Sequence, residues 1–190
     1  MKKEVSFEDV NDTALVREIV KSNNTMLFAI LYDRYAKIVY NKCYGFANSQ
    51  AEAEDLTQDV FLMLFVKLGS FKGQSKFSTW LYSFTYNFCV NYVQRDKHKK
   101  NENKTVVTDQ VKDEEVFDEI DDAALFELKA DKLAKAMSII EPNDKMILMM
   151  KYQDDLSIKE ISEGLEIGES AVKMRLKRAK EKVVKVYNEL

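Results

Sequence analysis

Turn-forming residues are scarce in this sequence: its 190 residues include only five glycines and one proline. An all-β sandwich or barrel needs a turn about every 8–12 residues, so an all-β fold is nearly excluded. Apolar residues instead recur at intervals of three and four, as at Leu56, Val60, Leu64 and Leu68. This spacing is typical of amphipathic helices. We therefore predict an all-α fold.

The helical pattern predicts helices in two groups. The first group covers residues 12–21, 25–45, 49–69 and 80–94, and the second begins near residue 125. Ser49 and Ser157 each open a Ser-x-x-Glu capping box, in which the serine oxygen accepts the third amide and the glutamate reaches back. In the first group, Ser78 or Thr79 can cap the helix that starts at Trp80. In the second, Pro142 suits the first turn of a buried helix.

Charge is unevenly distributed, although the net charge is only −3. Residues 71–104 carry a net +5, residues 105–131 carry −8, and residues 169–190 carry +4. The acid-rich stretch lacks apolar periodicity and cannot bury enough apolar area to offset its chain entropy. We therefore predict two small helical domains, at residues 10–98 and 125–190, joined by an acidic flexible linker at residues 99–124.

Several classes of protein are disfavoured by composition. The longest apolar run, Val60–Val66, is far shorter than the ~18 residues of a membrane span. No secretion signal follows the N-terminus. Two cysteines and one histidine make neither a disulfide framework nor a zinc site, so Cys43 and Cys89 are interpreted as buried apolar groups. We expect a cytoplasmic protein with no membrane insertion, cofactor or metal.

Carboxylates cluster at residues 113–115 and 121–122, the only feature that suggests an enzyme. No glycine-rich phosphate loop, nucleophile motif or histidine partner accompanies them. We therefore interpret them as part of the solvated linker and expect no catalytic residues.

The C-terminal segment has the pattern of a helix-turn-helix. A short helix after Ser157 turns through residues 166–168 into a second helix, whose buried stripe would be Val172, Leu176 and Ala179. Seven basic residues lie within residues 169–190, on the helix expected to enter a DNA groove. The alternative is a basic solvated helix that closes a three-helix bundle.

Eight aromatic residues crowd into residues 71–92. A helix buries one face only, so rings at alternating positions, as at Trp80, Tyr82 and Phe84, cannot all be core. Exposed rings interleaved with lysines suit single-stranded nucleic acid, because bases stack on rings while cations follow the phosphates. The alternative is an aromatic core with a basic fringe.

Three segments resemble parts of bacterial sigma factors. Their promoter-melting segment is similar to FKGQSKFSTWLYSFTYNFCVNYVQRDKHKK, and their polymerase-binding helix to AEAEDLTQDVFLMLFVKL. Their C-terminal helix-turn-helix resembles SIKEISEGLEIGESAVKMRLKRAKEKV. The short two-domain layout is that of the extracytoplasmic-function group, and the resemblance covers residues 10–98 (sigma region 2) and 125–190 (sigma region 4). Glu166 stands where the turn often has glycine, and Gly168 where a capping serine or proline is common.

The resemblance implies a subunit that binds core RNA polymerase, at the coiled coil of the largest subunit and at the flap, and directs it to promoters. An anti-sigma factor is a further partner that it allows. It assigns polymerase binding to Asp55, Leu56, Gln58, Asp59 and Phe61. Melted DNA of the minus-ten element is assigned to Lys72, Gln74, Ser75, Lys76, Phe77, Ser78, Trp80, Tyr82, Asn87 and Arg95. Duplex DNA of the minus-thirty-five element is assigned to Ser170, Lys173, Met174, Arg175, Lys177 and Arg178.

Two other functions remain open at this stage. A helix-turn-helix regulator that binds duplex DNA without polymerase would explain the second domain but leaves the aromatic segment without a purpose. A homodimer with palindromic specificity would favour this interpretation, because paired half-sites need two-fold symmetry. A protein-interaction module would have no affinity for DNA at any salt concentration.

Overall fold

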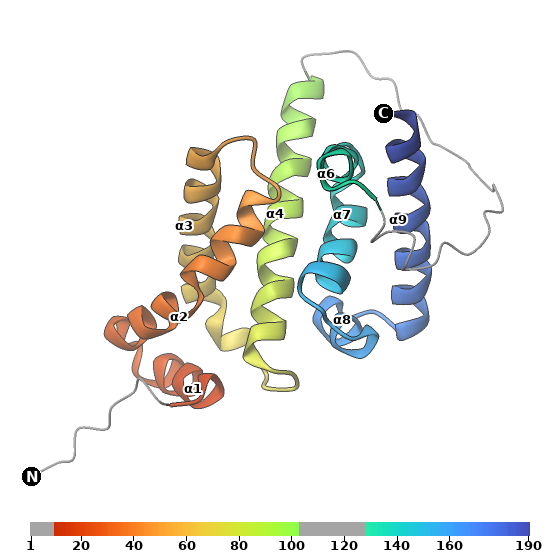
Figure 1. Ribbon diagram of the computed structural model, residues 1–190. Coiled ribbons are helices and arrows are strands. Elements are labelled where there is room, and N and C mark those ends of the chain that lie inside the picture. Colours follow the sequence, from red (N-terminus) through yellow and green to blue (C-terminus); the bar gives the residue numbers. More distant parts are fainter. Residues whose placement is uncertain (1–9, 103–127) are drawn as a thin grey trace, which may run out of the picture. The chain divides into compact units, whose positions relative to one another are not determined.

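A computed structural model describes residues 10–102 and 128–190 (Figure 1). All regular elements in these residues are helical, which confirms the predicted all-α class. Most of the expected linker, residues 103–124, lies outside the described residues. The chain divides into two compact units, residues 1–89 and 90–190, and the division falls within helix α4. Each unit is described by itself.

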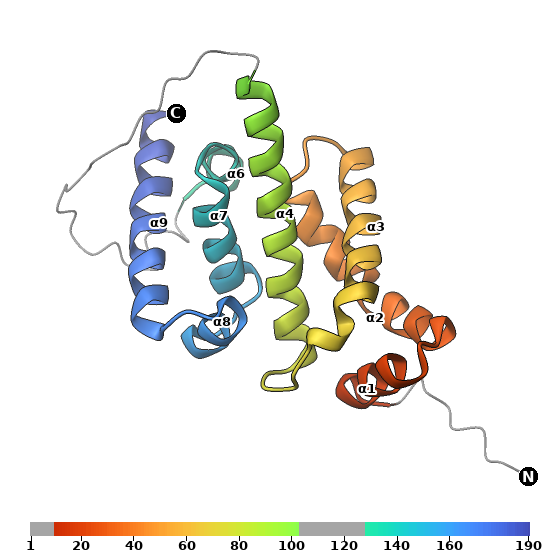
Figure 2. The ribbon, with the colours of Figure 1, turned by 180° about the vertical axis from the view of Figure 1, so that it is seen from behind.

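The helices of the N-terminal part are connected by short segments. They are α1 (Asp12–Ser22), α2 (Thr25–Tyr44), α3 (Gln50–Lys67), the 3-10 turn η2 (Leu68–Ser70) and α4 (Phe77–Glu102). Helices α2 and α3 lie side by side, as Figure 2 shows, and α1 packs against α2.

Side-chain caps explain several of these boundaries. The Asn11 side chain accepts the Ala14 N–H at 2.9 Å and opens α1, and Asn23, in the left-handed region at φ 50°, ends it. Ser49 accepts the Glu52 N–H at 3.2 Å, as predicted. The prediction that Glu52 reaches back to the N–H of Ser49 is wrong. Its carboxylate instead accepts the N–H of Asn48, one residue earlier, at 2.6 Å.

Helix α4 differs from its predicted boundaries at both ends. It begins at Phe77, so Ser78 and Thr79 lie inside its first turn and do not cap it. Thr79 is buried in the core. The helix continues past the expected end near Gln94, through the expected domain boundary, to Glu102.

The core of the first unit is apolar with one buried cation. Fully buried side chains from four helices include Leu15, Leu31, Val39, Leu56, Val60, Leu64, Leu81 and Tyr86. Lys42 is buried among them, with its Nζ 3.9 Å from the ring centroid of Tyr82. Cys43 and Cys89 are buried thiols with their Sγ atoms 3.8 Å apart, which confirms the interpretation of both as buried groups.

The second unit packs short helices against one long one. Its elements are α6 (Ala130–Ile139), α7 (Pro142–Leu148), the π-helical turn η3 (Met149–Gln153), α8 (Ile158–Leu165) and α9 (Glu169–Glu189). Helices α6, α7 and α8 all contact α9. Pro142 occupies the first turn of α7, and both halves of the Ser157 capping box are present, as predicted.

Candidate nucleic-acid and polymerase-binding surfaces

The turn between α8 and α9 is closed by a residue with a strained backbone. Glu166 ends α8 in the left-handed region, at φ 54° and ψ 39°, where glycine has the lowest cost. The Ser162 side chain donates to the Ile167 carbonyl at 2.6 Å and helps to hold the turn. Gly168 precedes α9 in an extended conformation and offers no side-chain cap. The predicted helix-turn-helix arrangement is therefore present.

Helix α9 has one buried stripe and a broad basic surface. Val172, Leu176, Ala179 and Val183 are buried. All six residues assigned to the minus-thirty-five element are exposed: Ser170, Lys173, Met174, Arg175, Lys177 and Arg178. The N-terminal half of α9 thus presents four cations to solvent, while its apolar stripe docks on the other helices.

The residues assigned to the minus-ten element fall into three classes of exposure. Lys72, Gln74, Lys76, Asn87 and Arg95 are exposed, whereas Ser75, Ser78, Trp80 and Tyr82 are half-buried. Phe77 is buried, and its ring meets that of Tyr35 at 5.5 Å in the core. Phe77 therefore packs in the core and does not offer a surface for DNA.

The expectation of exposed rings is met only in part. Two rings of this segment, Phe77 and Tyr86, are buried. The other six are half-buried: Phe71, Trp80, Tyr82, Phe84, Phe88 and Tyr92. Several of these rings pack on one another and so cover each other's faces.

Three of the rings form a continuous row, which we call the ring row: Phe71, Trp80 and Phe84. The Phe71 and Trp80 centroids are 5.5 Å apart, and Trp80 stacks on Phe84 at 5.4 Å with 25° between the planes. The row joins the loop after η2 to the first turns of α4. Two exposed lysines belong to the same loop: Lys72 follows Phe71 in the sequence, and Lys76 ends the loop before α4.

The residues assigned to polymerase binding all lie on α3 and form an exposed group and a buried group. Asp55, Gln58 and Asp59 are exposed. Leu56 and Phe61 are 1% and 4% exposed and belong to the core, because they lie on the face of α3 that packs against the rest of the unit. In this conformation they cannot contact a partner directly.

An apolar surface on α3 was missed by the sequence reasoning. Leu62 and Val66 are 69% and 74% exposed, and Met63 beside them is exposed too. They continue the row of Asp55 and Asp59 at helical spacing, opposite the buried stripe. The spacing 55, 59, 62, 66 was the signal that could have found it.

Comparison with known protein families finds two matches along this chain. Residues 31–99 match the family Sigma-70 region 2, and residues 130–183 match Sigma-70, region 4. Together the two matches cover more than half of the chain, in the order of that family. The chain belongs to the sigma-70 family.

Several curated relatives of this sigma factor are named extracytoplasmic-function (ECF) sigma factors. The ECF RNA polymerase sigma factor SigW of Bacillus subtilis is 28% identical over 178 residues, covering 90% of this chain and 94% of that protein. The ECF RNA polymerase sigma-E factor of Escherichia coli is 25% identical over 181 residues, covering 93% and 94%. The protein is an ECF sigma factor, and it directs promoter-specific initiation by RNA polymerase.

Two solved structures share the fold of this sigma factor. Sigma factor RpoE of Bartonella quintana, in complex with the anti-sigma factor NepR, has a TM-score of 0.58 at 15% identity, covering 85% of this chain and 96% of its own. CnrH, in complex with the cytosolic domain of CnrY, has a TM-score of 0.60 at 19% identity, covering 94% and 97%.

The described residues contain neither a helix that could span a membrane nor a cluster of metal-binding side chains. None of their helices is long and apolar enough to cross a membrane. Nor does any group of three or more His, Cys, Asp or Glu residues in this part of the chain come together as a metal site.

Proposed function

We propose that the two expected domains of this sigma factor share the work at a promoter. Residues 10–98 bind core polymerase and open the minus-ten element, and residues 125–190 read the duplex of the minus-thirty-five element. Residues 99–124 connect them. The observation that carries this proposal is the division of α9 into a buried apolar stripe and an exposed basic half at its N-terminal end.

In the second domain, duplex DNA would be read from the N-terminal half of α9. The major groove admits one helix, and a recognition helix contacts base edges with its first turns. Lys173 and Arg175 are exposed there and can donate to the O6 and N7 acceptors of guanine, at about 1–3 kcal/mol for each good contact. Lys177 and Arg178, one turn further along, suit the phosphates.

In the first domain, melted DNA would lie along the ring row and the loop before it. Opening a duplex costs a few kcal/mol for each unstacked base. Stacking on aromatic rings returns about 1–3 kcal/mol per base, and Trp80 offers a half-buried ring for this purpose. The exposed amide of Asn87 can hydrogen-bond a base edge, and the exposed Lys72 and Lys76 can follow the phosphates.

Core polymerase would meet two surfaces. The first is the exposed face of α3, with Asp55, Gln58 and Asp59 at one end and Leu62, Met63 and Val66 at the other. An apolar patch that is bordered by polar side chains suits the coiled coil of the largest subunit, because protein interfaces combine an apolar centre with a polar rim. Leu56 and Phe61 are buried, and we propose that they hold α3 in the position from which this face contacts polymerase.

The second polymerase surface would be an apolar hollow of about 220 Å³ in the second unit. Its walls come from α6, the α7–η3 segment and α9, and consist of Leu133, Met137, Leu148, Met149, Tyr152, Gln153 and Val183. We propose that the polymerase flap docks there.

A separate anti-sigma factor is proposed as the regulator. Sigma factor RpoE of Bartonella quintana is in complex with an anti-sigma factor, and CnrH is in complex with the cytosolic domain of CnrY. We propose further that the protein works in the cytoplasm and catalyses no reaction by itself.

Multi-round transcription with purified core polymerase tests the main proposal. The template is a library of upstream DNA fragments, transcribed with and without the full chain. Initiation that depends on this protein, from fragments that share two short elements, is the expected result. Duplex binding without core binding or initiation would instead support the helix-turn-helix regulator.

A variant of α3 tests the polymerase surface separately. Leu62→Glu puts a charge at the apolar centre and should weaken core binding without unfolding the helix, because Leu62 is exposed. The matched control is Met26→Glu, at an exposed apolar position on α2 that the proposal does not use. Equal core binding by both variants and the wild type would contradict the assignment of this face.

A further inference from the structure

The two cysteines of this chain lie far apart in the sequence, and helices α2 and α4 bring them into contact. The Sγ atoms of Cys43 and Cys89 are 3.8 Å apart, and the Cys89 S–H donates to the Cys43 sulfur. Both residues are completely buried in the first unit. None of the functions proposed above uses either thiol.

The geometry of this pair allows a covalent bond between the two sulfur atoms. Two cysteines can be bridged only if their side chains point toward each other, and here the sulfur atoms already meet. Bond formation would shorten the Sγ–Sγ distance from 3.8 Å to about 2.05 Å. Rotation about the two Cα–Cβ bonds, together with a small shift at the end of α2, can supply this approach.

The two thiols differ in how readily they lose a proton. The hydrogen bond from Cys89 lowers the pKa of Cys43 below its ordinary value of 9.0. The same contact, followed by burial, raises the pKa of Cys89 above that value. The thiolate is the form of cysteine that reacts with oxidants, so Cys43 is the nucleophile of the pair and Cys89 is its partner.

Cys43 lies close to the end of its helix, where local opening costs little. It is the last residue but one of α2, and its carbonyl accepts the N–H groups of Phe46 and Ala47 in the connection to α3. Helix ends and short connections open more often than the middle of a core helix. An opening of this connection, which moves the buried Phe46, would admit a molecule as small as hydrogen peroxide.

We propose that Cys43 and Cys89 are a site of reversible oxidation, at which a hydroperoxide joins α2 to α4 through a disulfide. The bond acts as a staple inside the first unit. It protects the fold of this unit under oxidising conditions and leaves its exposed surfaces in place, because both sulfur atoms are buried.

The reaction consumes one hydrogen peroxide for each bond that forms. The Cys43 thiolate attacks one oxygen, the O–O bond breaks, and hydroxide leaves and takes up the proton that Cys43 had lost, which gives a sulfenic acid and water. The Cys89 sulfur then attacks the Cys43 sulfur, and the sulfenic hydroxyl leaves with the Cys89 proton as a second water. The two thiols lose two electrons, which reduce the peroxide. A small thiol reverses the bond by exchange.

The staple would stabilise the part of the chain that carries the aromatic segment. It closes a loop between residues 46 positions apart, which removes conformational entropy from the unfolded state. Next to Cys43, Lys42 already contacts α4, with its Nζ 3.9 Å and 4.8 Å from the ring centroids of Tyr82 and Tyr86. The disulfide would add a covalent link to the same contact between the two helices.

Thermal unfolding of the full chain tests the staple, and Trp80 reports on the first unit alone because it is the only tryptophan. Its fluorescence is followed before treatment with hydrogen peroxide, after treatment, and after reduction with dithiothreitol. The melting temperature should rise by about 10–20 °C on oxidation and return on reduction. Non-reducing mass spectrometry of the oxidised chain should find the two cysteine peptides joined, with the loss of two hydrogen atoms.

Cys43→Ala and Cys89→Ala are the matched controls, because each keeps one thiol and cannot form the bond. Peroxide should stabilise neither variant. Reversal by dithiothreitol separates the disulfide from methionine sulfoxide, which is reduced by dedicated enzymes. The comparison within the wild type stands even if a variant fails to fold.

Three results would overturn the proposal. The first is that peroxide joins no cysteine peptides in the native chain, or joins them only in urea, which would mean that the fold keeps the thiols apart. The second is a bond that leaves the melting temperature unchanged. The third comes from transcription with core polymerase after the peroxide is removed: the oxidised protein should initiate as well as the reduced protein, and a loss that dithiothreitol restores would mean that the bond distorts the unit.

Discussion

Two adjacent residues of α9 should give opposite results when each is replaced by alanine. Leu176 is 6% exposed and belongs to the buried stripe, whereas Arg175 is exposed to solvent. A helix turns by about 100° between neighbours, so one side chain docks while the next faces outward. The assignment of α9 as a recognition helix requires this rotation.

The expected magnitudes follow from burial and from the contacts that each side chain can make. Leu176→Ala should lower the free energy of unfolding by about 2–5 kcal/mol, the usual cost of a buried leucine and its cavity. Arg175→Ala should change it by less than about 0.5 kcal/mol, because nothing buried is removed. Arg175→Ala should instead cost about 1–3 kcal/mol at one base pair of the minus-thirty-five element, or about 5- to 150-fold in affinity.

Two assays separate these effects. Urea unfolding followed by far-UV circular dichroism gives the free energy of unfolding. Holoenzyme binding to duplexes with single base-pair changes in the minus-thirty-five element shows which position each variant has stopped reading. Lys185→Ala is the matched control, because Lys185 is an exposed cation on the same helix about 15 Å further along.

Two results would contradict the assignment of α9 as a recognition helix. One is that Arg175→Ala destabilises the protein as much as Leu176→Ala does, and the other is that Arg175→Ala and Lys185→Ala weaken binding equally on every sequence. The first result would mean that α9 docks with another face, and the second that Arg175 reads phosphates alone.

Three further predictions concern other parts of the molecule. Burial, followed by the hydrogen bond to Asp12, raises the pKa of Tyr35 well above its ordinary value of 10.0. Above about pH 10 the unfolded state therefore loses this proton while the native state keeps it, which favours unfolding. In urea unfolding at pH 8 to 11, the stability advantage of the wild type over Tyr35→Phe should shrink above about pH 10. Glu166→Gly should raise the free energy of unfolding by about 0.5–1 kcal/mol, since the left-handed backbone at φ 54° costs glycine less; a decrease would contradict this. Gly73→Ala should lower it by about 1–2 kcal/mol because φ is 71°, and unchanged stability would mean that the loop has rearranged.

Local patterns in the sequence are sufficient to predict many of the helices and caps of this protein. Helix periodicity and capping depend on residues within one or two turns, so the positions of most helices and both serine caps at Ser49 and Ser157 could be predicted. The apolar stripe of α9 was predicted for the same reason, because its apolar residues occupy one face only. The acidic stretch between two basic ones is a property of composition alone.

The tertiary structure decided what short-range patterns leave ambiguous. In α3, seven apolar residues follow one another from Val60 to Val66, so this run places apolar side chains on every face of the helix. The packing of α3 against α2 buries Phe61 and leaves Leu62 and Val66 exposed, and in the sequence only their spacing from Asp55 and Asp59 indicates that outcome. Similarly, Trp80 and Phe84 are half-buried and stack on one another, which the alternation of rings in the sequence does not show.

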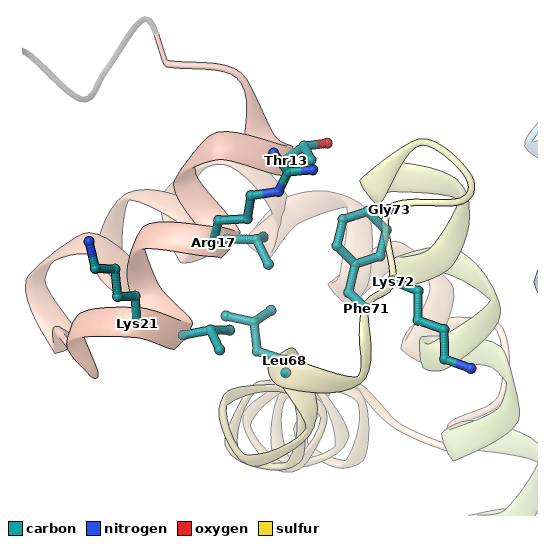
Figure 3. Close-up of a pocket in the computed structure, with 10 residues that line it drawn as sticks. Thr13, Arg17, Lys21, Leu68, Phe71, Lys72 and Gly73 are labelled. Atoms are coloured by element: carbon teal, nitrogen blue, oxygen red, sulfur yellow. The ribbon is translucent and has the colours of Figure 1, made fainter.

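A pocket between α1 and the loop after η2 depends on the tertiary structure most of all (Figure 3). Its lining comes from Thr13 to Lys21 and from Leu68 to Gly73, segments almost fifty residues apart. The first segment alone has the pattern of an ordinary amphipathic helix, and the second includes the start of the segment that resembles the promoter-melting part of sigma factors. Neither pattern shows that the two segments meet. The sequence by itself determined the helices, their caps and the family. The fold decided which side chains face solvent and which segments meet, because burial and pocket walls arise from contacts between residues far apart along the chain.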